Sequence, residues 1–379
     1  MKRYPTVFLA VVLTFIACTS RAFAQQPDGK KPAGEPVAVP ATPRELQILI
    51  MKLDKAGRGD DSDSGSSGIG ALMSALSQVK DPKLAGVLIY CLGTSTSWKV
   101  KAGCTAALTN IDTPESTEAL IKLLKSTPGR AEENDQALTR GGLRTQADFG
   151  MYGYSLTAAA KCVVQRGQVK SVIEDLKKFN LVKELAAGGK PGLEAIMEWS
   201  REVKSGKHEH HLPTGVTSAV AAIRSPGCLE LLREAALEEG LHDEVRLGAL
   251  RALAEGWGAD EYETIIKVAR NARSTYVSSE AYTAAVVADP KRAAEDLMPL
   301  LKSPHYPLRG KAAYLLGTIG NPKVIPDLVE LLDDEEDFVR LEALCGLWLL
   351  DHTKRTVKWR SPEYEERYEK WMSSHPKGK

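Results

Sequence analysis

The most constraining feature of this sequence is an internal repeat. Residues 308–332 repeat residues 100–124 at a constant offset of 208, and residues 339–347 repeat residues 308–316 at an offset of 31. A third copy begins at Val245. Weaker half-repeats occur at residues 69–92, 216–232 and 293–301. A period of about 30 residues is typical of arrays in which each unit buries its apolar face by stacking on its neighbours.

Each repeat unit predicts two helices. Counted from Leu308, the apolar residues of the second helix fall at places 0, 4, 7, 8 and 11, which is a helical stripe and not the alternation of a strand. Pro322 suits the start of the other helix, because its missing N–H needs no partner in a first turn. The alanine at place 4 lets neighbouring helices approach closely. The sequence therefore predicts an all-α solenoid of six to eight stacked helix pairs.

The repeat pattern resembles a known family. Its form is V-R-x-x-A-A-x-x-L-G-x-I-G-(N/D)-P-x-x-(I/V)-P-x-L-(V/I)-x-L-L, which is similar to HEAT repeats, particularly the short type also found in phycobilisome lyases. Residues 308–332 match almost place for place, and the resemblance extends over about residues 69–351. It implies a superhelix whose second helices line the concave surface. It implies little about function, because such repeats serve many unrelated proteins.

A basic residue recurs near the start of the second helix of the units. The positions are Lys101, Arg246, Arg309 and Arg340. In HEAT-like repeats this place usually pairs with an acid at the end of the previous helix. The acids so placed are Asp243, Asp333 and Asp334. A structural ladder of ion pairs is therefore favoured over an anion-binding row.

The first residues predict export. Residues 1–24 combine a Met1-Lys2-Arg3 start, a short apolar run and an Ala22-Phe23-Ala24 cleavage site, which together are typical of a secretory signal peptide. Cleavage would leave the mature chain periplasmic or secreted, with a net charge near −2 instead of the +1 of the whole chain. A lipobox-like alternative would place a lipid on Cys18. No later stretch predicts a transmembrane span.

The rest of the chain divides into three parts. Residues 25–68 predict a proline-rich linker, a short amphipathic helix at residues 44–56 and a Gly/Ser/Asp loop. Residues 69–352 hold the repeat array, and residues 353–379 predict a C-terminal capping helix and tail. Apolar residues of that helix lie at helical spacing, at Tyr364, Tyr368, Trp371 and Met372. Two departures from the repeat, at about residues 127–154 and 180–214, predict insertions at one edge of the array.

Composition and cysteine usage exclude several classes. A net charge of +1 gives no general attraction to nucleic acid. The cysteines after the signal peptide are five, widely spaced and without a C-x-x-C motif, which speaks against a disulfide scaffold, a zinc ribbon or c-type haem. They are Cys91, Cys104, Cys162, Cys228 and Cys345, and each is predicted to be a small buried hydrophobe. No cofactor is expected.

The motifs that could carry chemistry are few. The run His208-Glu209-His210-His211 offers three imidazoles, which suit zinc, copper or nickel, so His208, His210 and His211 form a weak metal candidate. The metalloprotease motif H-E-x-x-H fails there, because Leu212 occupies the second histidine place. An exposed polar loop is the competing interpretation. No motif predicts a catalytic residue, since the chain has neither Walker spacing nor G-x-S-x-G.

The expected concave surface supplies the binding hypothesis. Places 6 and 9 of the second helices fall off the buried stripe, and they put Arg251, Tyr314 and Trp348 on that surface as partner-binding candidates. Packing against the C-terminal cap is the alternative, above all for Trp348. The leading hypothesis is an exported scaffold, without catalytic activity, that holds a protein or peptide in its groove and takes no small-molecule ligand. The alternatives are an enzyme or chromophore-lyase-like protein that holds a substrate, and a metal-binding envelope protein.

Overall fold

The computed structural model describes residues 37–58, 66–127, 146–206 and 212–353. These residues form α-helices joined by short loops and 3-10 turns, and they contain no strand. The helices are α2 (Pro43–Arg58), α3 (Ser66–Ser77), α4 (Ala85–Thr94), α5 (Trp98–Thr109), α6 (Pro114–Ser126), α8 (Gln146–Gln165), α9 (Ile173–Lys178), α10 (Val182–Ala187), α11 (Lys190–Lys204), α12 (Val216–Ala221), α13 (Leu229–Leu237), α14 (Asp243–Trp257), α15 (Tyr262–Asn271), α16 (Thr275–Ala288), α17 (Pro290–Leu297), α18 (Tyr306–Ile319), α19 (Ile325–Glu330) and α20 (Asp337–Thr353). In these ranges no helix is both long and apolar enough to cross a membrane.

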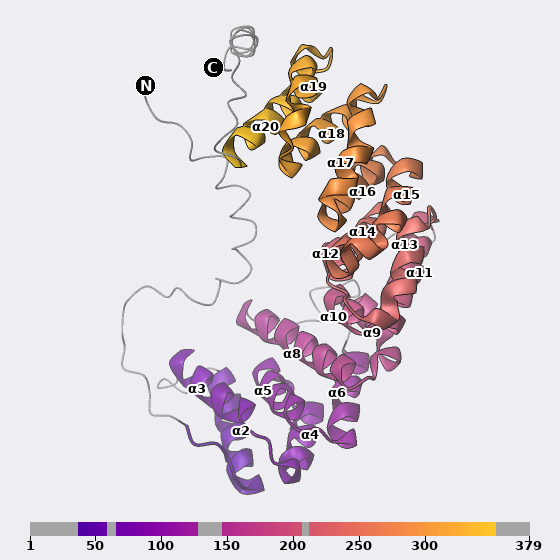
Figure 1. Ribbon diagram of the computed structural model, residues 1–379. Coiled ribbons are helices and arrows are strands. Elements are labelled where there is room, and N and C mark those ends of the chain that lie inside the picture. The colour runs from indigo at the N-terminus through magenta and orange to yellow at the C-terminus, as the bar shows by residue number, and fades with distance from the viewer. Residues whose placement is uncertain (1–36, 59–65, 128–145, 207–211, 354–379) are drawn as a thin grey trace, which may run out of the picture.

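The helices stack in two rows that follow an arc (Figure 1). The inner row runs through α5, α8, α10, α12, α14, α16, α18 and α20, and the outer row through α4, α6, α9, α11, α13, α15, α17 and α19. Helices α2 and α3 pack on α5 at the N-terminal end. The all-α solenoid predicted from the repeat is confirmed, and the second helix of each pair lies on the concave side.

Prolines and side-chain caps start the outer helices, as the sequence indicates. Helix α6 begins with Pro114 behind a capping box, in which Thr113 and Ser116 each accept a hydrogen bond from the other's backbone amide. Pro290 follows Asp289 at the start of α17, and the Asp289 carboxylate accepts from the amides of the next residues. These caps satisfy amides that have no partner within the helix, so each unit restarts at a fixed residue.

The core is one continuous layer between the two rows. The predicted stripe of α18 is buried, with Ala312 and Leu316 at 0% exposure. All five predicted core cysteines carry free thiols. Cys104, Cys162 and Cys228 are buried, and Cys91 and Cys345 are half-buried. Because the small side chains and the leucines alternate along each stripe, neighbouring helices can interdigitate.

The two predicted insertions contain helices. Residues 146–154 form the first half of α8, and residues 182–187 and 190–204 form α10 and α11, which belong to the two rows. These stretches match the repeat pattern poorly because their helices are irregular in length. The remaining parts of the two stretches, residues 128–145 and 207–211, lie outside the described residues, as do the predicted signal peptide and capping helix.

The arginine ladder is structural. Arg309 Nη1 donates to the Ser303 carbonyl oxygen at 2.7 Å, and its Nε and Nη2 donate to the Asp334 carboxylate at 2.8 and 2.9 Å. Arg340 Nη1 donates to the Asp334 carbonyl oxygen at 2.5 Å. In both units the guanidinium closes the turn that enters the inner helix. These arginines donate hydrogen bonds to carbonyl oxygens that would otherwise have no partner near a helix end.

Two positions of the ladder differ from the prediction. Arg246 pairs with Glu239 at 2.8 Å, while Asp243 accepts a hydrogen bond from Ser274 at 2.8 Å. Lys101 lies over the ring of Trp98, with its Nζ 4.5 Å from the ring centroid. Burial lowers the pKa of Lys101. The basic residue of these four units therefore has a partner that depends on the loop that faces it.

The Arg309–Asp334 pair predicts an acid-sensitive C-terminal end. Burial alone would raise the pKa of Asp334, but the hydrogen bonds from Arg309 and from the Glu336 amide outweigh it and lower that pKa below its usual range. A carboxylate of this kind stabilises the fold above its unfolded pKa of about 3.9, and the contribution is lost as pH falls through the lower folded pKa. We expect thermal unfolding followed from about pH 5 to pH 2 to show a smaller acid loss in Asp334→Asn than in the wild type. An equal loss would contradict this role.

Candidate partner-binding surface

Large apolar side chains are exposed mainly on the inner row. Of the 13 large hydrophobic residues that are exposed in the described ranges, eight lie on inner helices and two on outer helices. The eight are Tyr154, Tyr276, Val287, Tyr306, Tyr314, Phe338, Leu341 and Trp348. Five of these belong to α18 and α20 alone. The last two inner helices therefore expose the most large apolar side chains.

An aromatic row crosses the first turns of three successive inner helices. It consists of Tyr276 on α16, Tyr306 on α18 and Phe338 on α20. The rings of Tyr306 and Phe338 meet edge to face, with centroids 6.3 Å apart. Phe338 packs over Gly310, where a Cβ would come within 2.6 Å of its ring. The glycine thus gives Phe338 its position, and Tyr314 adds a further aromatic two turns along α18.

A row of alternating charges runs beside the aromatic row. Arg251 Nη2 lies 3.5 Å from Glu280, and Lys311 Nζ lies 3.0 Å from the same carboxylate. Glu342 continues the row on α20, where burial raises the pKa of its carboxyl and the nearby Lys311 offsets part of that rise. The row therefore joins α14, α16, α18 and α20 across the inner face, with its charges largely neutralised internally.

The three predicted candidates have different places on this surface. Arg251 and Tyr314 are exposed on inner helices, and Arg251 belongs to the charge row. Trp348 is 49% exposed. The residue at the same place one unit earlier is Gly317, which is buried against the backbone of Gly346. Place 9 is thus a packing position, and Ala254 is buried there too. Trp348 lies at the same place in the last described helix, toward the open end of the array.

The sequence reasoning missed most of the two rows. Glu280, Lys311 and Glu342 follow one another at intervals of 31 residues. Tyr276 and Phe338 hold equivalent places in their units, and Pro307 holds that place in the unit between them. A place-by-place alignment of the last three units would have shown the charge row, and the aromatic row apart from Tyr306. The unit at residues 275–288 keeps apolar residues at the stripe places, but Ser278 stands in its basic place.

A comparison with known families finds a match in the C-terminal part of the chain. Residues 262–348 match a family model described as HEAT repeats. The matched range runs from α15 to α20, so it includes the whole aromatic row.

Other comparisons add little to the HEAT match. No curated protein matches the chain. Among solved structures, human deoxyhypusine hydroxylase in complex with glycerol is similar at 17% identity and a TM-score of 0.31, over 82% of this chain and 100% of that chain. A likeness of this size carries no argument about the activity of this protein.

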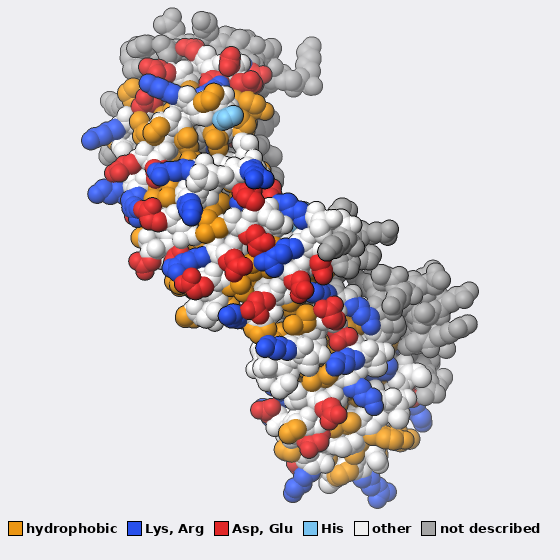
Figure 2. Space-filling model, turned by 90° about the vertical axis from the view of Figure 1, so that its right-hand side faces the viewer, with side chains coloured by type: hydrophobic (Ala, Val, Ile, Leu, Met, Phe, Trp, Pro, Cys, Tyr) orange, Lys and Arg blue, Asp and Glu red, His pale blue; other side chains and the backbone are white. Residues whose placement is uncertain are grey.

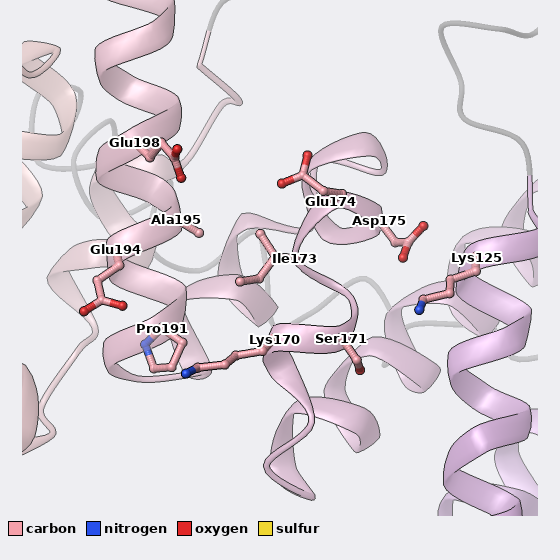
Figure 3. Close-up of a pocket in the computed structure, with 10 residues that line it drawn as sticks. All are labelled: Lys125, Lys170, Ser171, Ile173, Glu174, Asp175, Pro191, Glu194, Ala195 and Glu198. Carbon is pink, nitrogen blue, oxygen red and sulfur yellow. The ribbon is translucent and has the colours of Figure 1, made fainter.

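A hollow on the outer side of the array is lined by charges (Figure 3). Its volume is about 590 Å³, and it lies between α6, α9 and α11. Glu174 and Asp175 come from α9, Glu194 and Glu198 from α11, and Lys125 points toward Asp175 from α6. Burial raises the pKa of Asp175, and Lys178 and Lys125 offset part of the rise. Its lining offers no cysteine or histidine and no paired nucleophile and base.

The metal candidate cannot be placed on the helical array. His208, His210 and His211 lie outside the described residues. Within the described ranges, no group of three or more His, Cys, Asp or Glu side chains could hold a metal ion.

Proposed function

We propose that this protein is an exported HEAT-repeat scaffold that holds a protein or peptide partner on its concave face and catalyses no reaction. The observation that carries the proposal is the concentration of exposed aromatic side chains on α16, α18 and α20. The outer face offers a contrast, because acidic and basic side chains are interspersed over it (Figure 2). Aromatic residues that remain exposed on a rigid surface are common anchors of protein interfaces.

The charge row indicates what kind of contact the partner makes. Glu280 already accepts from Arg251 and Lys311, so the inner face offers few unpaired charges along this row. Affinity should therefore come from apolar burial on the tyrosines and Phe338, with a weak dependence on salt. A neutral, apolar segment of a partner fits this surface better than a strongly charged one.

Export is the part of the proposal that rests on sequence alone. Residues 1–24 have the pattern of a cleaved signal peptide, which would place the scaffold in the periplasm or outside the cell, with lipidation at Cys18 as the alternative. The resemblance to the short, phycobilisome-lyase type of HEAT repeat also rests on the sequence alone. Nothing in the described residues favours the lyase-like or metal-binding alternatives.

Site-specific photocrosslinking in cells tests the concave face. A benzophenone amino acid would replace Tyr276 or Tyr314 on the inner row, and Tyr90 on outer helix α4 in the matched control, where the tyrosine is 69% exposed. We expect defined adducts from the two inner positions and none from position 90, with the partner named by mass spectrometry. Adducts that are the same at all three positions, or absent from the inner two, would contradict the proposal.

The identified partner then allows a binding measurement with purified mature protein. We expect Tyr314→Ala combined with Arg251→Glu to weaken binding at least tenfold, while the unfolding temperature changes little because both side chains are exposed. Undiminished binding by this double variant would show that the partner sits elsewhere.

A further inference from the structure

The last described helix carries bulky side chains where its neighbour carries almost none. Helix α18 faces α20 with Gly310, Ala313 and Gly317. A Cβ on Gly317 would come within 2.3 Å of the Gly346 Cα, and a Cβ on Gly346 would come within 2.6 Å of the Ala313 carbonyl oxygen. The two helices therefore meet backbone to backbone along this face.

The corresponding face of α20 lies 31 residues further along and points away from α18. Its residues are Leu341, Leu344 and Trp348, which we call the end face. Leu341 is 48% exposed and Trp348 is 49% exposed, while Leu344 is half-buried. Terminal units of repeat arrays need a polar outer face for solubility, and the end face is the opposite.

The end face does not suit a helix that packs as closely as α20 packs on α18. Such a helix would need glycine or alanine at these three places, and two leucines and a tryptophan would hold it off. The cover must instead interdigitate with large apolar side chains. Such a cover presents its own large side chains on one side of a helix.

The geometry points to residues 354–379 of this same chain as the cover of the end face. They follow α20 directly, and their sequence places Tyr364, Tyr368, Trp371 and Met372 at helical spacing after the start signal Ser361-Pro362-Glu363. Residues 354–360 can span about 23 Å when extended. The distance back along α20 from its last residue to Leu341 is about 18 Å. The chain is therefore long enough to return over the end face.

Charge supports the same occupant. Residues 354–379 carry eight Lys and Arg against four Glu, a net charge of +4. The end face is bordered by the acidic run at residues 333–337, in which Glu335 and Glu336 are exposed. Attraction between the two would favour the return of the segment over its extension into solvent.

A second copy of the chain is the competing occupant. The N-terminal end of the array also exposes apolar side chains, with Ile48 at 47% and Met51 at 63% exposure on α2. Contact between that end of one molecule and the end face of another would be head to tail, and such contacts build open chains of molecules. Cover by the C-terminal segment would instead keep the protein monomeric.

Hydrogen exchange on the full-length mature protein separates these cases. The test variant is Tyr368→Ser with Trp371→Ser, and the matched control is Ile48→Ser with Met51→Ser. We expect amides of residues 341–350 to exchange at least tenfold faster in the test variant than in the wild type, and at the wild-type rate in the control. Residues of α14 should exchange alike in all three, and light scattering should show monomers.

Two results would overturn the proposal. Unchanged exchange of residues 341–350 in the test variant would mean that the C-terminal segment does not cover the end face. Protection that rises with protein concentration and is lost in the Ile48→Ser, Met51→Ser variant would assign the end face to a second copy. Neither result depends on the partner of the concave face, so the scaffold proposal is tested separately.

Discussion

Gly317→Val is expected to lower the stability of the C-terminal repeats by about 3 kcal/mol. The added Cβ would lie 2.3 Å from the Gly346 Cα and 2.5 Å from its carbonyl oxygen, and neither atom can rotate away. Because an array is held by contacts between neighbouring units, the loss should fall on α18 and α20 and leave the rest folded. Hydrogen exchange should show α20 opening about a hundredfold more readily.

A glycine with free space around it provides the control. A Cβ at Gly153 in α8 would meet nothing within 4 Å. Gly153→Ala should therefore stabilise its helix by about 0.5–1 kcal/mol, since glycine is the less favourable residue in a helix interior. If the amides of α20 in Gly317→Val exchanged within twofold of the wild-type rate, this would contradict the close backbone contact between α18 and α20.

Arg233→Gln should cost about 3 kcal/mol at neutral pH. Arg233 on α13 donates to both oxygens of Glu261 in the turn before α15, at 2.9 Å from its Nε, and the Glu261 side chain is only 2% exposed. The hydrogen bonds from Arg233 lower the pKa of Glu261. Without them a buried carboxylate would keep only the Thr264 hydroxyl, at 3.1 Å, as a partner.

The pH dependence of the Arg233→Gln variant identifies the cause. A buried carboxylate without its cation has a raised pKa, so the variant should be least stable relative to the wild type at neutral pH, and the difference should shrink near about pH 4 as Glu261 takes up a proton. Adding Glu261→Gln should recover part of the loss at neutral pH. Urea unfolding at the two pH values measures both effects.

The matched control is an arginine–glutamate pair at the surface. The side chains of Arg224 and Glu255 are 40% and 53% exposed, so Arg224→Gln should cost less than about 1 kcal/mol at either pH. A loss in Arg233→Gln as small as in this control would mean that the Glu261 pair is not buried as described.

The repeat register explains how far the fold could be predicted. Arg309, Pro322 and the stripe on Ala312 and Leu316 recur at fixed intervals, and each has one physical task, so their positions define the helix pairs. The stretch at residues 180–204 did not show its helices in the repeat pattern, because α10 and α11 differ in length from those of the regular units. Pattern matching finds a unit only where its spacing is kept.

The candidate surface was predicted less well, because exposure depends on the neighbouring unit. Place 9 looks free of the stripe in one helix, but Gly317 and Ala254 are covered by the next helix of the stack. Tyr314, at place 6, points away from that contact and is exposed, as predicted. Only an alignment of several units shows that Glu280 and Lys311 face each other.

The close contact at Gly317 also limits how this array can change in length. In α16 the places of Ala313 and Gly317 are held by Tyr282 and Val286, so the step from α16 to α18 lacks this backbone contact. A unit inserted between α18 and α20 would need its own glycine opposite Gly317. Helices α18 and α20 therefore form a fixed pair, and length variation among arrays built on this plan should be confined to the units before them.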